Sequence, residues 1–161
     1  MSTFAIFMTQ FSLSLIAIAL LAKGYLWPRL QNQSRQEALM PLLFIHTFRS
    51  VALGVMVPDL VDPAFPQGIA ATIGYGDLTS SVLALVTLAA LTVNARIAFL
   101  LAWVFTIVGS IDVIGATVIG AQNEMYSFDL GPQWYVPTFY VPLLMVTHIM
   151  IVLVLLKKEK S

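Results

Sequence analysis

Long apolar runs that are almost free of charged residues are the feature that most constrains this sequence. Five such runs occur, at residues 4–27, 38–57, 78–93, 97–122 and 137–156. An α-helix rises 1.5 Å per residue, so about 20 apolar residues cross the hydrocarbon core of a bilayer. The sequence therefore predicts an all-α membrane protein, in which residues 1–161 form a single bundle of about five transmembrane helices.

The composition agrees with lipid as the surrounding solvent. Hydrophobic residues make up 59% of the chain and charged residues 10%, whereas a globular domain carries about a quarter charged residues. The formal net charge is zero, so no basic surface is available to hold nucleic acid by its phosphates. The chain contains no cysteine, which excludes disulfides, thiolate metal sites, iron–sulfur clusters and cysteine nucleophiles.

The first and third runs each allow a second interpretation. No Lys or Arg precedes the first run, so we interpret it as a spanning helix, with a cleaved signal peptide as the minor alternative. The third run is the shortest, and it either extends back through residues 68–72 or crosses a locally thinned bilayer.

The polar segment 28–37 is predicted to be an exposed loop. The connections that contain Pro58, Pro63 and Pro66, and Gly131 and Pro132, are predicted to be irregular.

Basic residues indicate the orientation, because Lys and Arg beside a span are retained on the cytoplasmic side. In a five-span arrangement one side receives every basic residue except Arg49, namely Lys23, Arg29, Arg35, Arg96, Lys157, Lys158 and Lys160. The other side receives no Lys or Arg, and its charged residues are all acidic, namely Asp59, Asp62, Asp77, Glu124 and Asp129. We therefore expect the N-terminus outside and the C-terminus in the cytoplasm.

Four ionisable residues lie within the predicted spans, where each costs several kcal/mol unless it is paired or hydrated. His46 and Arg49 share one face of the second span, Asp112 lies in the fourth, and His148 lies in the fifth. Counting from Glu37 and from Lys157 places both histidines roughly 13 Å from the inner boundary. Arg49 then lies near the midplane and Asp112 somewhat nearer the outer face.

Asp112 is predicted to face a neighbouring helix and to pair with Arg49. Small residues that permit close helix packing follow the same stripe of the fourth span, at Gly109, Ala116 and Gly120. A carboxylate on that face would be enclosed and would need a partner. Arg49 is the first candidate, and the secondary candidates are Ser110, Thr106 and Thr47.

Several functions fit this polar set. The charged pair and the histidines could fix helix register, or bind and move a proton or small solute, because histidine titrates near neutral pH. As a third hypothesis, His46 and His148 could supply both axial ligands of a b-type haem. Zinc is a weaker hypothesis, because two histidines and a remote carboxylate lack diagnostic spacing.

The stretch Thr72-Ile73-Gly74-Tyr75-Gly76-Asp77 is similar to the selectivity filter of potassium channels. Such a filter follows a pore helix of about a dozen residues, and Pro66 leaves no room for one. We instead predict a tight turn at Gly74 and Gly76, with Asp77 or Thr79 capping the third helix.

The chain also resembles a group of small, uncharacterised bacterial multi-pass membrane proteins. The likeness rests on these motifs: His46-Thr47-Phe48-Arg49, Val57-Pro58, Tyr75-Gly76-Asp77-Leu78, the stretch from Trp103 to Asp112, Tyr135-Val136-Pro137, and Pro142-Leu143-Leu144 through Thr147-His148. The resemblance implies a multi-pass fold in a bacterial inner membrane and no particular activity. It suggests that His46, Arg49, Asp77, Asp112 and His148 form the site.

The function that we predict from these residues is binding or translocation of a small solute or proton at His46, Arg49, Asp112 and His148. Arg49 would attract an anionic group, Asp112 would be its counter-charge, and the histidines would relay or sense protons from the cytoplasmic side. Thr47, Asp77 and Trp103 are secondary site residues. The alternatives are a haem protein, a structural membrane subunit without a ligand, and a membrane-embedded lipid enzyme. The enzyme is weaker because the chain has no Ser-His-Asp spacing, no His-Glu-x-x-His helix and no Gly-rich phosphate cradle. An oligomer or a larger membrane complex is compatible with each of them.

Overall fold

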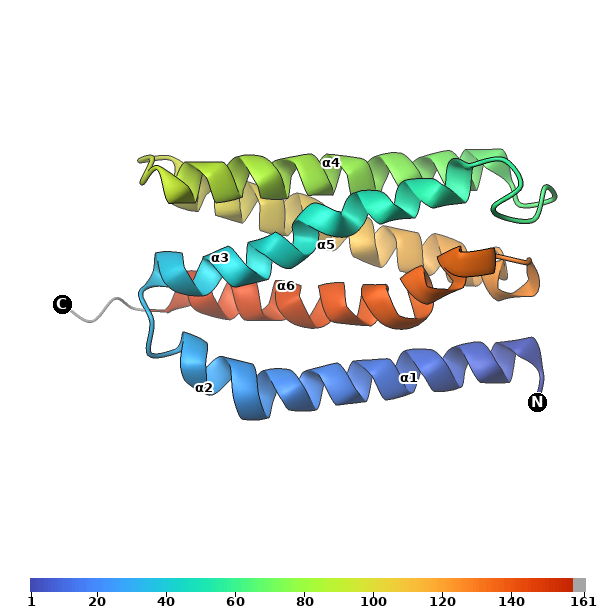
Figure 1. Cartoon of the computed structure of the whole chain (residues 1–161), viewed down its shortest axis with the longest axis horizontal. Helices are drawn as coiled ribbons and strands as arrows, with labels where there is room; N and C mark the ends of the chain where they lie inside the picture. Colours follow the sequence, from blue (N-terminus) through green and yellow to red (C-terminus); the bar gives the residue numbers. More distant parts are fainter. Residues whose placement is uncertain (158–161) are drawn as a thin grey trace.

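The computed structural model describes residues 1–157, and these residues form helices and no strand. Lys158 and Lys160, two of the predicted cytoplasmic residues, lie outside the described part. Five helical segments run side by side, with the start of α1 (Thr3–Leu21) and the end of α6 (Val141–Leu156) at opposite ends of the bundle (Figure 1). We call these two ends the N-terminal end and the C-terminal end.

Each segment combines one or more helices in chain order. The first is α1 (Thr3–Leu21), the π-helical turn η1 (Ala22–Leu26) and α2 (Trp27–Leu30); the second is α3 (Arg35–His46) and the 3-10 helix η2 (Thr47–Met56); the third is α4 (Gln67–Thr92); the fourth is α5 (Ala98–Gln122); the fifth is the 3-10 turn η4 (Gly131–Trp134), the π-helical turn η5 (Val136–Tyr140) and α6 (Val141–Leu156). A short 3-10 turn, η3 (Met125–Ser127), follows α5. All five segments are long and apolar enough to cross a membrane, which confirms the predicted all-α chain with five such helices.

The first connection is shorter than the predicted loop at residues 28–37. The first segment stays helical to Leu30, and α3 already begins at Arg35. A capping box fixes this start, because the Ser34 hydroxyl accepts from the Glu37 amide while the Glu37 carboxylate accepts from the Ser34 amide. Only residues 31–34 therefore form the turn.

The third segment begins at Gln67 instead of residue 78, in agreement with the alternative that this run extends back through residues 68–72. The earlier start corrects the interpretation of the filter-like stretch. Gly74 and Gly76 lie inside α4, and Asp77 is in the middle of that helix instead of capping its start. The glycines serve packing: a Cβ at position 74 would lie 2.8 Å from Met56 Sδ, and one at position 76 would overlap the Asp112 carboxylate. Close contact with η2 and α5 therefore outweighs the low helix propensity of glycine.

The second segment changes from α to 3-10 geometry at Thr47 and keeps that geometry for 10 residues. Runs of 3-10 helix longer than three or four residues are uncommon. Side chains from other helices bond the backbone at the change: Tyr140 Oη donates to the Ile45 carbonyl at 2.6 Å, and Ser81 Oγ donates to the Thr47 carbonyl at 2.5 Å. Contacts with α4 and the fifth segment thus fix where η2 begins.

Two apolar clusters close the two ends of the bundle to different extents. The larger cluster fills the C-terminal half with buried side chains from α3, α4, α5 and α6, among them Leu39, Leu43, Phe105, Ile151 and Val154. The smaller cluster lies at the N-terminal end around Phe65 and Leu130. Helix α1 contributes no buried residue and lies along the edge of the bundle (Figure 1). The polar residues lie between the two clusters.

Candidate functional site

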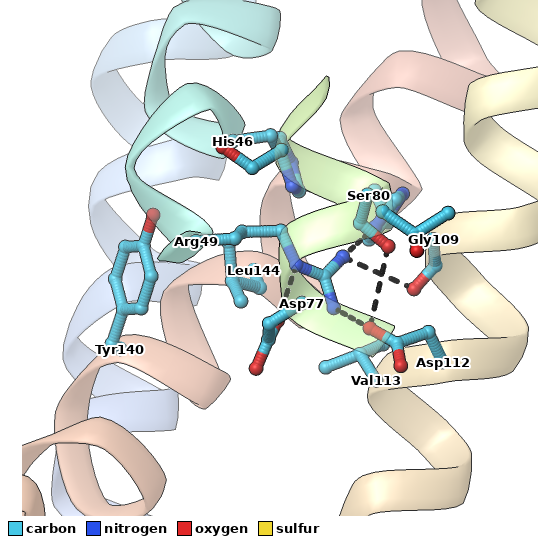
Figure 2. Close-up of polar contacts among 12 residues, drawn as sticks. His46, Arg49, Asp77, Ser80, Gly109, Asp112, Val113, Tyr140 and Leu144 are labelled. Carbon is cyan, nitrogen blue, oxygen red and sulfur yellow. Dashed lines mark hydrogen bonds and ion pairs between the residues drawn. The ribbon is translucent and has the colours of Figure 1, made fainter. Parts of the chain in front are cut away.

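Arg49 occupies the centre of the polar site. Its residue surface is 1% exposed, and its guanidinium points between α4 and α5 (Figure 2). Nε donates to Asp77 Oδ1 at 2.6 Å, Nη2 donates to Asp112 Oδ2 at 2.5 Å, and Nη1 donates to the Gly109 carbonyl at 3.2 Å. Every nitrogen of the side chain therefore has a partner from α4 or α5.

The predicted pairing of Arg49 with Asp112 is present, but the predicted hydroxyl partners of Asp112 are not. Ser80 of α4 provides that contact, with Oγ 3.3 Å from Asp112 Oδ2. Thr106 Oγ1 instead donates to the Ala102 carbonyl, and Thr47 Oγ1 donates to the Phe44 carbonyl. Trp103 lies on the exposed surface of α5.

Asp77 is a central member of the site, whereas the sequence predicts it as a secondary site residue among the acidic residues of the outer side. Its side chain is 9% exposed and bonded to Arg49. The helical spacing of small and polar residues could have revealed this, because one buried stripe of α4 contains Ala70, Gly74, Asp77, Ser81 and Ala84. Once α4 is continuous, Asp77 lies on its buried face.

We call Arg49, Asp77 and Asp112 the charge centre. Its negative and positive charges are unequal in number. Two ionised carboxylates and one guanidinium sum to a net charge of −1. Burying an uncompensated charge away from water is costly. The charge centre can lower that cost by taking up one proton or one monovalent cation.

The histidines lie together on the C-terminal side of the charge centre, as their matched depths predict. Their ring centroids are 4.3 Å apart. His148 Nε2 is 3.3 Å from Arg49 Nη1, and His46 Nε2 is 2.9 Å from Thr147 Oγ1. Both Nδ1 atoms are buried without a hydrogen-bond partner among the described residues. Each ring therefore keeps one buried nitrogen without a partner among the described residues.

This arrangement does not fit the haem hypothesis. Axial ligands of one iron must face each other across the porphyrin plane, whereas these two rings contact each other directly. Both Nε2 atoms are engaged elsewhere, and the ring of Phe105 stacks on His148 with an interplanar angle of 20°. Within residues 1–157, no three His, Asp or Glu side chains form a group that could hold a metal ion.

A cavity of about 320 Å³ borders the charge centre on the side of the N-terminal end. Asp77 forms part of its wall, together with mainly apolar side chains of α1, α4, α5 and the fifth segment. Neither histidine lines the cavity. The His and Asp pair that a membrane-embedded lipid enzyme would need in one cavity is thus divided between two surroundings.

Comparison with known proteins places the chain in a family. A protein-family model described as a domain of unknown function (DUF8737) matches residues 6–156. The chain belongs to this family. The match extends over all five helical segments and includes every residue of the charge centre and both histidines. No curated protein and no solved structure gives a significant match to the chain.

Proposed function

We propose that this member of the family is a multi-pass protein of the bacterial inner membrane, in which the charge centre binds and exchanges one proton during proton or small-solute transport. The N-terminal end would face the outside and the C-terminal end the cytoplasm. The distribution of charge supports this orientation, because Arg29, Arg35, Arg96 and Lys157 all lie at helix ends or turns of the C-terminal end.

One observation carries the proposal: a single buried arginine is shared by two carboxylates from different helices. With both carboxylates ionised, the charge centre holds one negative charge in excess. One proton bound to either carboxylate would make the charge centre neutral without breaking the contact of the other with Arg49. A group that gains so much from one proton is suited to bind and release it.

Access to the charge centre is unequal from the two ends, as transport by alternating access requires. Asp77 lines the cavity toward the N-terminal end. Toward the C-terminal end, the larger apolar cluster lies beyond His46 and His148. The histidines would be the next proton sites once that cluster opens.

The earlier hypothesis that Arg49 binds an anionic solute has less support. Its guanidinium is buried and already bonded to two carboxylates, one carbonyl and one imidazole. An anion would have to displace a carboxylate that is covalently part of the bundle. The excess of negative charge also repels anions.

Infrared difference spectroscopy of the purified protein in lipid tests the proton site. Lowering the pH should produce a carboxylic-acid C=O band that is lost or shifted in Asp77→Asn and in Asp112→Asn. Asp59→Asn is the matched control, because Asp59 is an exposed loop residue with a φ of 63°, which asparagine tolerates. Its spectrum should keep the band.

Proton movement is measured separately, with a pH-sensitive dye enclosed in proteoliposomes. Wild-type protein should dissipate an imposed pH gradient faster than Asp77→Asn. If both aspartate variants give the wild-type infrared band, no proton binds at the charge centre. The charge centre would then only fix the packing of η2, α4 and α5, which is the structural alternative.

A further inference from the structure

The cavity beside Asp77 combines an apolar wall with one carboxylate. Aromatic side chains of α1 form one side, at Phe4, Phe7 and Phe11, and the opposite side includes Ile73, Ala116 and Val141. Its volume of about 320 Å³ is at the lower end of the range for sites of small organic molecules. The cavity is therefore suited to a compact apolar body with a single polar group.

Asp77 is positioned to meet that polar group. Its Oδ1 accepts from Arg49 Nε, and no hydrogen bond within residues 1–157 reaches Oδ2. Asp112 faces the same guanidinium from α5, so the field at the cavity wall is that of two carboxylates and one arginine. A cation at Oδ2 would complete the charge balance, whereas an anion or a neutral group would leave it incomplete.

Helix α1 forms one wall of this cavity and packs along one edge of the bundle. It has no buried residue, and near the N-terminal end it is held by Gln10, whose Oε1 accepts from Trp134 Nε1 at 2.6 Å. Phe7 packs edge-on against Trp134, with ring centroids 5.5 Å apart. Because no residue of α1 is enclosed by the bundle, its separation from the other segments exposes little buried surface, and a molecule dissolved in the bilayer could enter beside it.

We propose that this cavity binds a lipophilic monocation, a compact apolar molecule with one protonated amine that pairs with Asp77. The inference rests on the proposed function, because the ammonium group would occupy the same excess negative charge as the proton. Ammonium and proton would then compete for the charge centre. Binding of the amine would release the bound proton, which is the exchange that a proton-coupled transporter of such molecules needs.

Three probes that share a similar apolar group but differ in charge test the charge preference of the cavity: phenylbutylammonium, phenylbutanol and phenylbutyrate. Binding would be measured by calorimetry on the full chain in nanodiscs of phosphatidylcholine, with empty nanodiscs as the blank. Only the ammonium probe should bind saturably, and it should release a proton that an indicator dye detects in weak buffer. Asp77→Asn should weaken its binding on the order of tenfold, the equivalent of about 1.4 kcal/mol.

Variants that fill the cavity test its location. Ala116→Phe and Thr117→Phe place a ring in the cavity and should abolish binding of the ammonium probe. Ile114→Phe is the matched control, because Ile114 is 58% exposed on α5 and does not line the cavity. This variant should bind the probe as the wild type does. Thermal unfolding of each variant shows whether it is folded.

Equal binding of all three probes would overturn the inference and indicate that the cavity holds any apolar chain, including a lipid tail. Unchanged binding in a folded Ala116→Phe or Thr117→Phe variant would also overturn it. If the infrared band at the charge centre is present but the ammonium probe does not bind, the inference fails and the proton site stands. If the probe binds with the expected Asp77 dependence and the band is absent, the cation site stands and the proton proposal fails.

Discussion

Gly109 and His148 approach so closely that no side chain fits between them. A Cβ at position 109 would lie 2.8 Å from His148 Cε1 and 3.0 Å from Nε2, and 3.2 Å from Arg49 Nη1. Gly109 also offers its carbonyl to that same Nη1. The contact between α5 and α6 at this point therefore sets the positions of both the imidazole and the guanidinium.

The first prediction follows from this contact. Gly109→Ala should lower the free energy of unfolding by about 1–3 kcal/mol, because the methyl group overpacks a filled interior. Thermal unfolding followed by circular dichroism measures the effect. Gly115→Ala is the control on the same helix, since nothing lies within 4 Å of its added Cβ; it should be neutral or slightly stabilising. Equal effects of the two substitutions would contradict the close packing.

The second prediction concerns the charge balance. Arg49→Ala leaves two buried carboxylates without their cation and should cost about 3–5 kcal/mol of stability. The triple variant Arg49→Met, Asp77→Asn, Asp112→Asn removes all three charges and should recover much of that loss in thermal unfolding. Arg29→Ala, at an exposed arginine, should cost less than about 1 kcal/mol. A triple variant as unstable as Arg49→Ala would argue against charge imbalance as the cause.

The third prediction is that the neutral histidines are opposite tautomers. Thr147 Oγ1 already donates to the carbonyls of Leu143 and Leu144, so it accepts from a protonated His46 Nε2. Arg49 Nη1 can only donate, so His148 Nε2 accepts and the proton of this ring lies on Nδ1. Nitrogen-15 NMR of labelled protein distinguishes the two forms, and Thr147→Val should alter only the His46 signals. Identical tautomers would show that the two rings are bonded differently.

The fourth prediction concerns orientation, and the absence of cysteine makes it simple to test. Single cysteines in place of Asn32 and Val93 should resist a membrane-impermeant maleimide added to intact cells. Cysteines in place of Ala64 and Ser127 should react. All four positions are exposed, so disruption of the cells should make every one reactive. Labelling of the first pair in intact cells would reverse the proposed topology.

The helices and the first charged pair could be predicted because they depend on signals that are local or nearly so. Apolar runs report spans directly, and a rise of 1.5 Å per residue converts sequence spacing into depth. That conversion brought His46 and His148 to one level and left Arg49 within reach of Asp112, in agreement with the observed contacts.

The place of Asp77 could not be predicted from the same signals. Two glycines and an aspartate within four residues favour a turn locally, and only close packing keeps them helical. Met56 fills the space beside Gly74, and Asp112 fills the space beside Gly76. The cavity was also beyond prediction, because its walls depend on where α1 lies against helices distant in sequence.

The 3-10 geometry of η2 makes the second segment longer than an α-helix of the same number of residues would be. Each residue rises about 2.0 Å in a 3-10 helix and 1.5 Å in an α-helix, so rewinding the 10 residues of η2 would shorten it by about 5 Å. Rewinding would also turn each residue by about 100° instead of 120°, so Arg49 would rotate relative to Val55. A change of winding in this one segment could thus withdraw the guanidinium from a carboxylate while the four other segments stay in place.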